Sequence, residues 1–141
     1  MFGCELVGGD ITSWGDTGGK FVINSTIFGQ AGEKGPIRRN GAGSGDVICV
    51  TGELGGSIKG KHMDFVPRVK EAMRLLELVN VHSMMDISDG LSSDLGRICS
   101  ASRVGALLEA KKIPISKVSD GLDGALHDGE DFELLFTVSE N

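Results

Sequence analysis

Acidic and hydroxyl side chains gather in one short stretch, MMDISDGLSSDLG, which places Asp86, Ser88 and Asp89 within four positions of a glycine and a helix-like pattern. Alternate side chains of a strand share a face, so Asp86 and Ser88 are expected to point the same way while Asp89 turns into the helix. Mg²⁺ takes oxygen ligands and often bridges to nucleotide phosphates. The stretch therefore predicts a site for a hard cation. Capping of the helix by Ser88 or Asp89, together with a solvated acid, explains the same residues equally well.

Two further turns combine glycines with acids. The stretch VGGD ends at Asp10, directly after Gly9, and the stretch HDGEDFELLF carries Glu130 and Asp131 before an apolar run. Glycines let a backbone approach phosphate oxygens, and an adjacent carboxylate can hold the metal that neutralises them. An ordinary turn is the simpler explanation of VGGD, and a turn with solvated acids explains HDGEDFELLF equally well.

A basic loop supplies the opposite charge. The stretch RRNGAGSGD sets Arg38 and Arg39 before a glycine-rich turn, and a guanidinium can clamp a phosphate. No Gly-Lys-Ser/Thr ending follows, so the loop is not a Walker loop, and it lacks the dinucleotide fingerprint. The histidines show no metal-ligand spacing and are expected to be structural. Acidic turns beside an arginine loop together favour a site for phosphate and magnesium.

The overall composition narrows the possible partners. The chain of 141 residues carries a net charge of -6 with 14 Lys and Arg, which argues against binding to a nucleic-acid backbone. No apolar run approaches the length of a membrane span, and no charged-then-apolar leader is present, so we expect a cytoplasmic protein that binds no membrane. The three cysteines are odd in number and lack metal-type spacing, so we expect free thiols.

The elements that must position these side chains follow from hydrophobic periodicity. Strands alternate with helices, which predicts an α/β (α+β layered) fold of packed layers. The glycine-rich stretch after residue 29 is the best candidate for a domain boundary. We expect strands at 21–29, 47–52, 82–88, 104–110 and 132–138, and helices at 66–79 and 92–102.

Four segments resemble a known family in order and spacing. LVGGDIT, RRNGAGSGDVICVTGELGGS, MMDISDGLSSDLGRICSAS and ALHDGEDFELLFTV are similar to segments of the thiamine-monophosphate kinases, members of the AIR synthase-related (PurM-like) family. The resemblance implies a PurM-like C-terminal domain with a mixed sheet packed by helices, preceded by the last strand of an N-terminal domain. It assigns residues 1–31 to the remainder of an N-terminal ATP- and magnesium-binding domain, and residues 32–141 to a C-terminal domain truncated at its own end.

The resemblance also implies an activity, namely ATP- and Mg²⁺-dependent phosphoryl transfer to thiamine monophosphate that yields thiamine diphosphate. Such transfer depends on positioning and on cations more than on a covalent nucleophile. The whole enzyme is expected to be a homodimer. By the same resemblance, the magnesium ligands are Asp10, Asp86 and Asp89, the ATP contacts are Gly9, Asp10, Arg39 and Ser88, and the contact to thiamine monophosphate is Glu130.

The chain departs from the family pattern in several places. Ile11 stands where the family has threonine after its GGD motif, and the aspartates of the family's N-terminal half do not precede Met1. We therefore expect a fragment that is inactive alone. A binding or interaction module without catalysis, and a related enzyme with another acceptor, are the alternatives. If the chain binds neither ATP nor thiamine monophosphate, the module is favoured. The acceptor that the full-length protein phosphorylates, of aminoimidazole type or thiamine type, tests for the related enzyme.

Overall fold

The computed structural model describes residues 3–12, 15, 18, 21–32 and 34–140, and it divides the chain into two compact units, residues 1–35 and 36–141. The described residues of the first unit form no helix or strand. The strand expected at 21–29 is therefore wrong: Phe21, Ile27 and Phe28 are exposed, and no neighbouring strand in the described part of this unit pairs with them. An alternating pattern forms a strand only where a neighbouring strand pairs with it.

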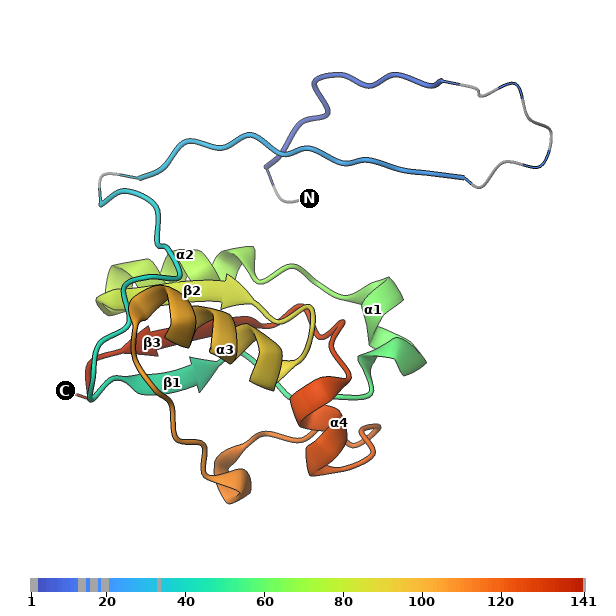
Figure 1. The fold of residues 1–141 in the computed structure, drawn as a ribbon. Helices are drawn as coiled ribbons and strands as arrows, with labels where there is room; N and C mark the ends of the chain where they lie inside the picture. The colour runs from blue at the N-terminus through green and yellow to red at the C-terminus, as the bar shows by residue number, and fades with distance from the viewer. Residues whose placement is uncertain (1–2, 13–14, 16–17, 19–20, 33, 141) are drawn as a thin grey trace. The chain divides into compact units, whose positions relative to one another are not determined.

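The second unit is built on a three-stranded sheet of order β1-β3-β2 (Figure 1). Its strands are β1 (Val47–Val50), β2 (Val81–Asp86) and β3 (Leu134–Val138), and β3 pairs antiparallel with both others. Inside this sheet the buried hydroxyls of Ser83 and Thr137 share a 2.9 Å hydrogen bond across the β2–β3 pair. The pairing brings the C-terminal end of β2, with Asp86, beside the start of β3.

Two longer helices and several short ones complete this unit. The expected helices and the strands at 47–52, 82–88 and 132–138 are confirmed, with ends shifted by a few residues. None of the helices in the described residues is long and apolar enough to cross a bilayer. The helical segments are η1 (Ser57–Lys59), α1 (Lys61–Asp64), α2 (Val69–Leu78), α3 (Leu91–Ser102), η2 (Ala110–Lys112) and α4 (Leu122–His127).

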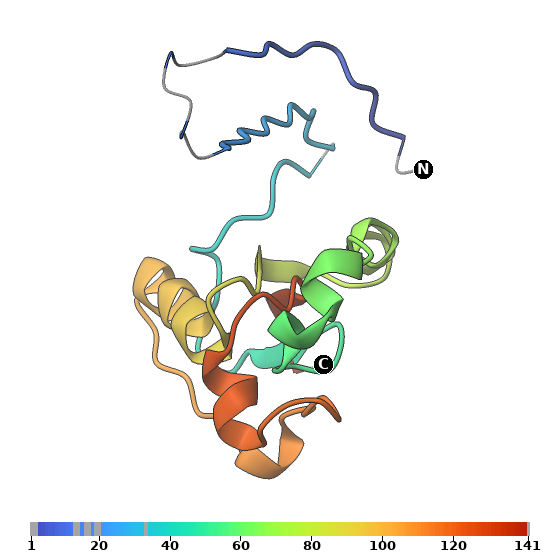
Figure 2. The ribbon, with the colours of Figure 1, turned by 90° about the vertical axis from the view of Figure 1, so that its right-hand side faces the viewer.

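The sheet lies between α3 and α2 (Figure 2). Alternation along β3 explains the arrangement, since Leu135 is buried in the core against α3 while Phe136 faces a cleft lined by Leu75 of α2. The apolar residues of α3 recur at helical spacing and enter the same core. That core contains Leu54, Ile87, Leu91, Leu95, Ile98, Ala125 and Leu135. The α/β fold is confirmed, and the cysteines are free thiols.

The strand expected at 104–110 is wrong. α3 ends at Ser102, Arg103 follows it in the left-handed conformation, and the next segment carries no strand up to η2. Leu107 is 88% exposed, so its apolar side chain does not enter the core. Leu108 and Ile113 pack against the core, but the segment pairs with no strand of the sheet. Its isolated bridge joins Ile115 to Leu54, outside the sheet. An apolar run without a partner edge therefore stays irregular.

Candidate active site

The acidic turn lies where β2 passes into α3. Asp86 ends the strand and is exposed, Ile87 is fully buried in the core, and Gly90 precedes the helix with φ 99°. A non-glycine residue rarely adopts that conformation. The buried Ile87 anchors the turn, so the polar residues on either side of it remain at the surface.

The expectation that Ser88 or Asp89 caps α3 is wrong, because no side-chain cap is formed at this helix start. The fully buried Asp94, in the first turn of the helix, instead reaches back along the chain. Its Oδ2 accepts hydrogen bonds from the backbone N–H groups of Ser88 and Asp89, both at 3.0 Å. The Ser88 and Asp89 side chains therefore make no capping hydrogen bond to α3.

The second acidic turn packs directly against the first. The N–H of Glu130 donates to the carbonyl oxygen of Ser88 at 2.9 Å, and the N–H of Phe132 donates to that of Ile87 at 2.8 Å. Glu130 and Phe132 both have left-handed backbones, with φ 57° and 50°. Each such residue costs on the order of 1 kcal/mol and persists only where its surroundings hold it. The structure therefore brings Glu130 against the Ser88–Asp89 turn.

Asp131 lies between those two left-handed residues and is not a solvated acid. It is 1% exposed, and its carboxylate accepts hydrogen bonds from the Gly55 N–H at 3.0 and 3.1 Å and from the Ser57 hydroxyl. A carboxylate buried on backbone and hydroxyl donors fixes the chain around it. Asp131 therefore holds the Glu130 turn in its unusual conformation.

Glu133 is a third buried acid, and sequence reasoning missed it. Its carboxylate is 1% exposed and is bound at 2.7 Å by Lys61 and twice by Arg68, with the Thr51 hydroxyl at 2.6 Å. Burial raises the pKa of Glu133, but the hydrogen bonds from Arg68, Lys61 and Thr51 outweigh it and lower the pKa to about 2. Its position in the alternating run EDFELLF, facing inward with Asp131, is the signal that could have revealed it.

The arginine loop meets the acidic turn at a shallow cleft. This cleft of about 510 Å³ is lined by Ile37, Arg38, Arg39, Asn40, Met84, Met85, Asp86 and Ala101. The Ser102 hydroxyl, at the end of α3, donates to the Arg39 carbonyl at 2.8 Å and accepts from the Ala42 N–H at 3.1 Å. The structure thus brings Arg39 and Asp86 to one surface, and α3 supports that arrangement.

His82 holds the far end of the same loop. Its Nδ1 lies 2.9 Å from both carboxylate oxygens of Asp46, which also accepts the Gly43 N–H at 2.8 Å. Burial raises the pKa of Asp46, and the bonds from Gly43 and His82 outweigh it, so the pKa is lowered. His82 is therefore a structural residue, as the sequence predicts.

A smaller apolar cleft of about 310 Å³ adjoins Asp86 on its other side. It is lined by Phe65, Pro67, Arg68, Val69, Ala72, Asp86, Phe132 and Leu134. The rings of Phe65 and Phe132 lie with centroids 4.4 Å apart. Asp86 thus stands between a basic cleft and an aromatic one.

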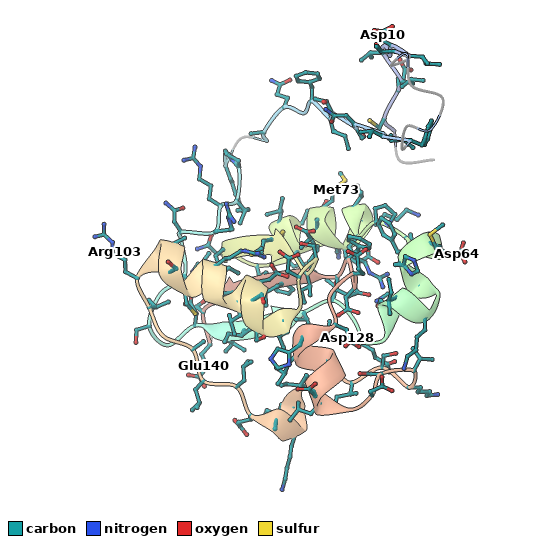
Figure 3. All side chains as sticks on the ribbon, turned by 45° about the vertical axis from the view of Figure 1, so that its right-hand side comes forward. Asp10, Asp64, Met73, Arg103, Asp128 and Glu140 are labelled. Carbon is teal, nitrogen blue, oxygen red and sulfur yellow. The ribbon has the colours of Figure 1, made fainter. Side chains whose placement is uncertain are left out.

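Gly9 and Asp10 lie in the first unit, and both are exposed. The Asp10 carboxylate accepts the Ile11 N–H at 2.9 Å and the Thr12 hydroxyl at 3.5 Å, so it is held by its own turn (Figure 3). A side chain at Gly9 would meet nothing within 4 Å. The described residues of this unit therefore present a free glycine backbone beside an acid.

Asp86 and Asp89 suit a hard cation by their chemistry, because both are exposed carboxylates at one turn. Arg97 already places a positive charge at Asp89, with its Nη2 at 2.5 Å from Oδ2. Within the part of the chain that the structure describes, no three His, Cys, Asp or Glu residues gather as a metal site. These two acids alone provide an incomplete ligand set.

Comparison with known proteins finds one matching family and several relatives. Residues 43–141 match the family described as AIR synthase related protein, C-terminal domain. The thiamine-monophosphate kinase of Rhodopirellula baltica is 43% identical over 143 residues, covering 95% of this chain and 44% of that protein. That of Methanospirillum hungatei is 40% identical, covering 99% and 51%. The chain thus spans about half the length of the curated relatives it matches.

Solved structures give the same result. The crystal structure of thiamine-monophosphate kinase from Stenotrophomonas maltophilia superposes with a TM-score of 0.62 at 32% identity, covering 74% of this chain and 42% of that one. A structure described as AaThiL complexed with AMPPCP and TMP superposes with a TM-score of 0.66 at 26% identity over the same shares. The resemblance to thiamine-monophosphate kinases is therefore confirmed, and the chain belongs to the AIR synthase-related family.

Proposed function

We propose that this chain supplies part of the active site of a thiamine-monophosphate kinase, which transfers the γ-phosphoryl group of ATP to the phosphate of thiamine monophosphate. One observation carries the proposal: the Glu130 turn is hydrogen-bonded to Ser88, next to Asp86 and Asp89. The turn that carries Glu130, the proposed contact to the acceptor, is thereby held against the turn that carries the proposed contacts to the nucleotide and its metal. Phosphoryl transfer needs this juxtaposition more than it needs a nucleophilic side chain.

In this proposal the acidic and basic residues of the second unit contact different groups. Asp86 and Asp89 would hold Mg²⁺, which neutralises phosphate charge when bound. Arg39 would bind nucleotide phosphate through its guanidinium, and Ser88 would contact ATP. Glu130 would contact thiamine monophosphate. The backbone bonds of Ser88 keep these groups in place before any ligand arrives.

The first unit would contribute the remaining contacts. We assign residues 1–31 to an ATP- and magnesium-binding domain, where Gly9 lies beside ATP and Asp10 is a further magnesium ligand and ATP contact. Residues 32–141 form the AIR synthase-related C-terminal domain in this proposal. The complete enzyme is expected to act as a homodimer, and the 141 residues alone are expected to be inactive.

Replacement of Asp86 in the complete enzyme tests the proposal. Asp86→Asn keeps the side-chain shape but removes a metal ligand, so kcat should fall by about a hundredfold or more. Asp64→Asn, which changes an exposed acid of α1 (Figure 3), should leave kcat unchanged. Full activity of Asp86→Asn with thiamine monophosphate, or turnover of an aminoimidazole-type acceptor instead, would contradict the assignment.

A further inference from the structure

Arg97 joins the two carboxylates around the acidic turn. It lies on α3 one turn after Asp94, and its Nη2 is 2.5 Å from Oδ2 of Asp89 while its Nη1 binds Oδ1 of Asp94. A guanidinium is always protonated in a protein, so the positive charge of Arg97 persists. A fixed cation therefore occupies Asp89 in the structure.

The two carboxylates differ in what they can still bind. Asp94 is fully buried, with Oδ2 on the Ser88 and Asp89 amides and Oδ1 on Arg97, so both its oxygens are engaged. Asp89 is 56% exposed and Arg97 is 43% exposed. The exposed bond from Arg97 to Asp89 can break while the bond from Arg97 to buried Asp94 stays. Asp89 alone can thus exchange the guanidinium for another cation.

We propose that Arg97 competes with the divalent cation for Asp89, so that Asp89 becomes a metal ligand only when the guanidinium leaves it. The inference deepens the proposed function and rests on it, since that function makes Asp89 a metal ligand. Two cations at one carboxylate repel each other, and at a surface the repulsion between a guanidinium and a divalent ion weakens metal binding by roughly thirtyfold at a separation near 4 Å. Arg97 thereby limits metal binding to conditions in which further anionic oxygens, such as nucleotide phosphates, assist it.

The test uses Mn²⁺ alone as the probe, without nucleotide, and follows the paramagnetic broadening of the Asp89 and Gly90 amide signals by NMR. Arg97→Gln keeps a hydrogen-bond donor and removes the charge, so it should bind Mn²⁺ roughly thirtyfold more tightly at low salt. Arg74→Gln is the matched control, because it makes the same change of net charge at an exposed arginine that pairs with Glu77 on α2. It should leave the affinity unchanged.

Two further variants locate the effect. Arg97→Lys keeps the charge and should bind Mn²⁺ as the unaltered chain does, which also separates charge from any loss of packing. Asp89→Asn in the Arg97→Gln background should abolish the gain. Circular dichroism establishes that each variant is folded.

Equal affinity in Arg97→Gln and Arg74→Gln, or no Mn²⁺ broadening at Asp89 in any variant, would overturn the competition. Failure of the proposed function would be observed in a different measurement, as the absence of phosphoryl transfer to thiamine monophosphate by the complete enzyme. Because Mn²⁺ binding is read without nucleotide or acceptor, the two failures are distinguishable.

Discussion

The backbone N–H of Glu130 donates a 2.9 Å hydrogen bond to the carbonyl oxygen of Ser88. Gly129 makes this approach possible, since a Cβ at that position would lie 2.6 Å from the same oxygen. Gly129 also has φ 71°, which a side chain disfavours. The two acidic turns therefore depend on one glycine for their contact.

Gly129→Ala should separate the turns and destabilise the fold by roughly 1–3 kcal/mol, because both the left-handed backbone and the close contact oppose a methyl group. Denaturant unfolding measures this loss. Gly96→Ala is the control: Gly96 lies in α3 with nothing within 4 Å of an added Cβ, and the change should stabilise the helix by about 1 kcal/mol. Equal effects of the two variants would contradict the proposed contact.

Asp131→Asn should loosen the Glu130 turn. The amide replaces a charged acceptor of the Gly55 N–H and the Ser57 hydroxyl, so we expect a loss of about 1–3 kcal/mol in the free energy of unfolding. Asp120→Asn changes an 81% exposed acid paired with Lys59 and should alter stability by under about 1 kcal/mol. A stable Asp131→Asn variant would show that the turn is held by other contacts.

Ser102→Ala should free the arginine loop. It removes the acceptor of the Ala42 N–H and the donor to the Arg39 carbonyl, at about 1 kcal/mol for a typical hydrogen bond. Hydrogen exchange at the Ala42 amide should then quicken about fivefold. Ser102→Thr should restore protection, and Ser100→Ala, an exposed serine of the same helix, should not change it. Unchanged exchange in Ser102→Ala would exclude this anchor.

Acid should weaken the fold through Glu133. Its pKa is lowered from 4.5 to about 2 in the native state, so the unfolded chain binds the proton first as the pH falls. The stabilisation is present above pH 4.5 and is lost towards pH 2, by on the order of 3 kcal/mol. Urea titrations over this range measure it. Glu133→Gln should flatten the dependence, whereas Glu109→Gln, an exposed partner of Lys112, should not.

Hydrophobic periodicity predicted the elements that have a packing partner. β1, β2, β3 and α3 carry an apolar pattern that the sheet or core receives. α2 also forms as predicted, although none of its residues is buried. The segments at 21–29 and 104–110 carry similar patterns but have no pairing edge, so they stay irregular. Short α1 and α4 escaped notice, because a helix of four to six residues has too few turns to show a period.

The candidate site was predicted in part. Asp86, Ser88, Asp89 and Glu130 stood out because acids and glycines share short turns. The burial of Asp131 and Glu133 depends on donors distant in sequence, Gly55 for Asp131 and Arg68 for Glu133, so only the alternation of EDFELLF hints at it. Asp94 is buried on the nearby Ser88 and Asp89 amides, which its spacing alone does not reveal. Local pattern locates a polar turn, but tertiary contacts decide which of its acids face solvent.

α3 is anchored at both ends, by Asp94 to the Ser88–Asp89 amides and by Ser102 to the arginine loop. Because a helix is stiff, it works as a spacer of set length and phase between the two loops. One inserted residue between Asp94 and Ser102 would rotate the second anchor by about 100° and shift it by about 1.5 Å. The helix should therefore tolerate exchange of its exposed side chains far better than any change in its residue count.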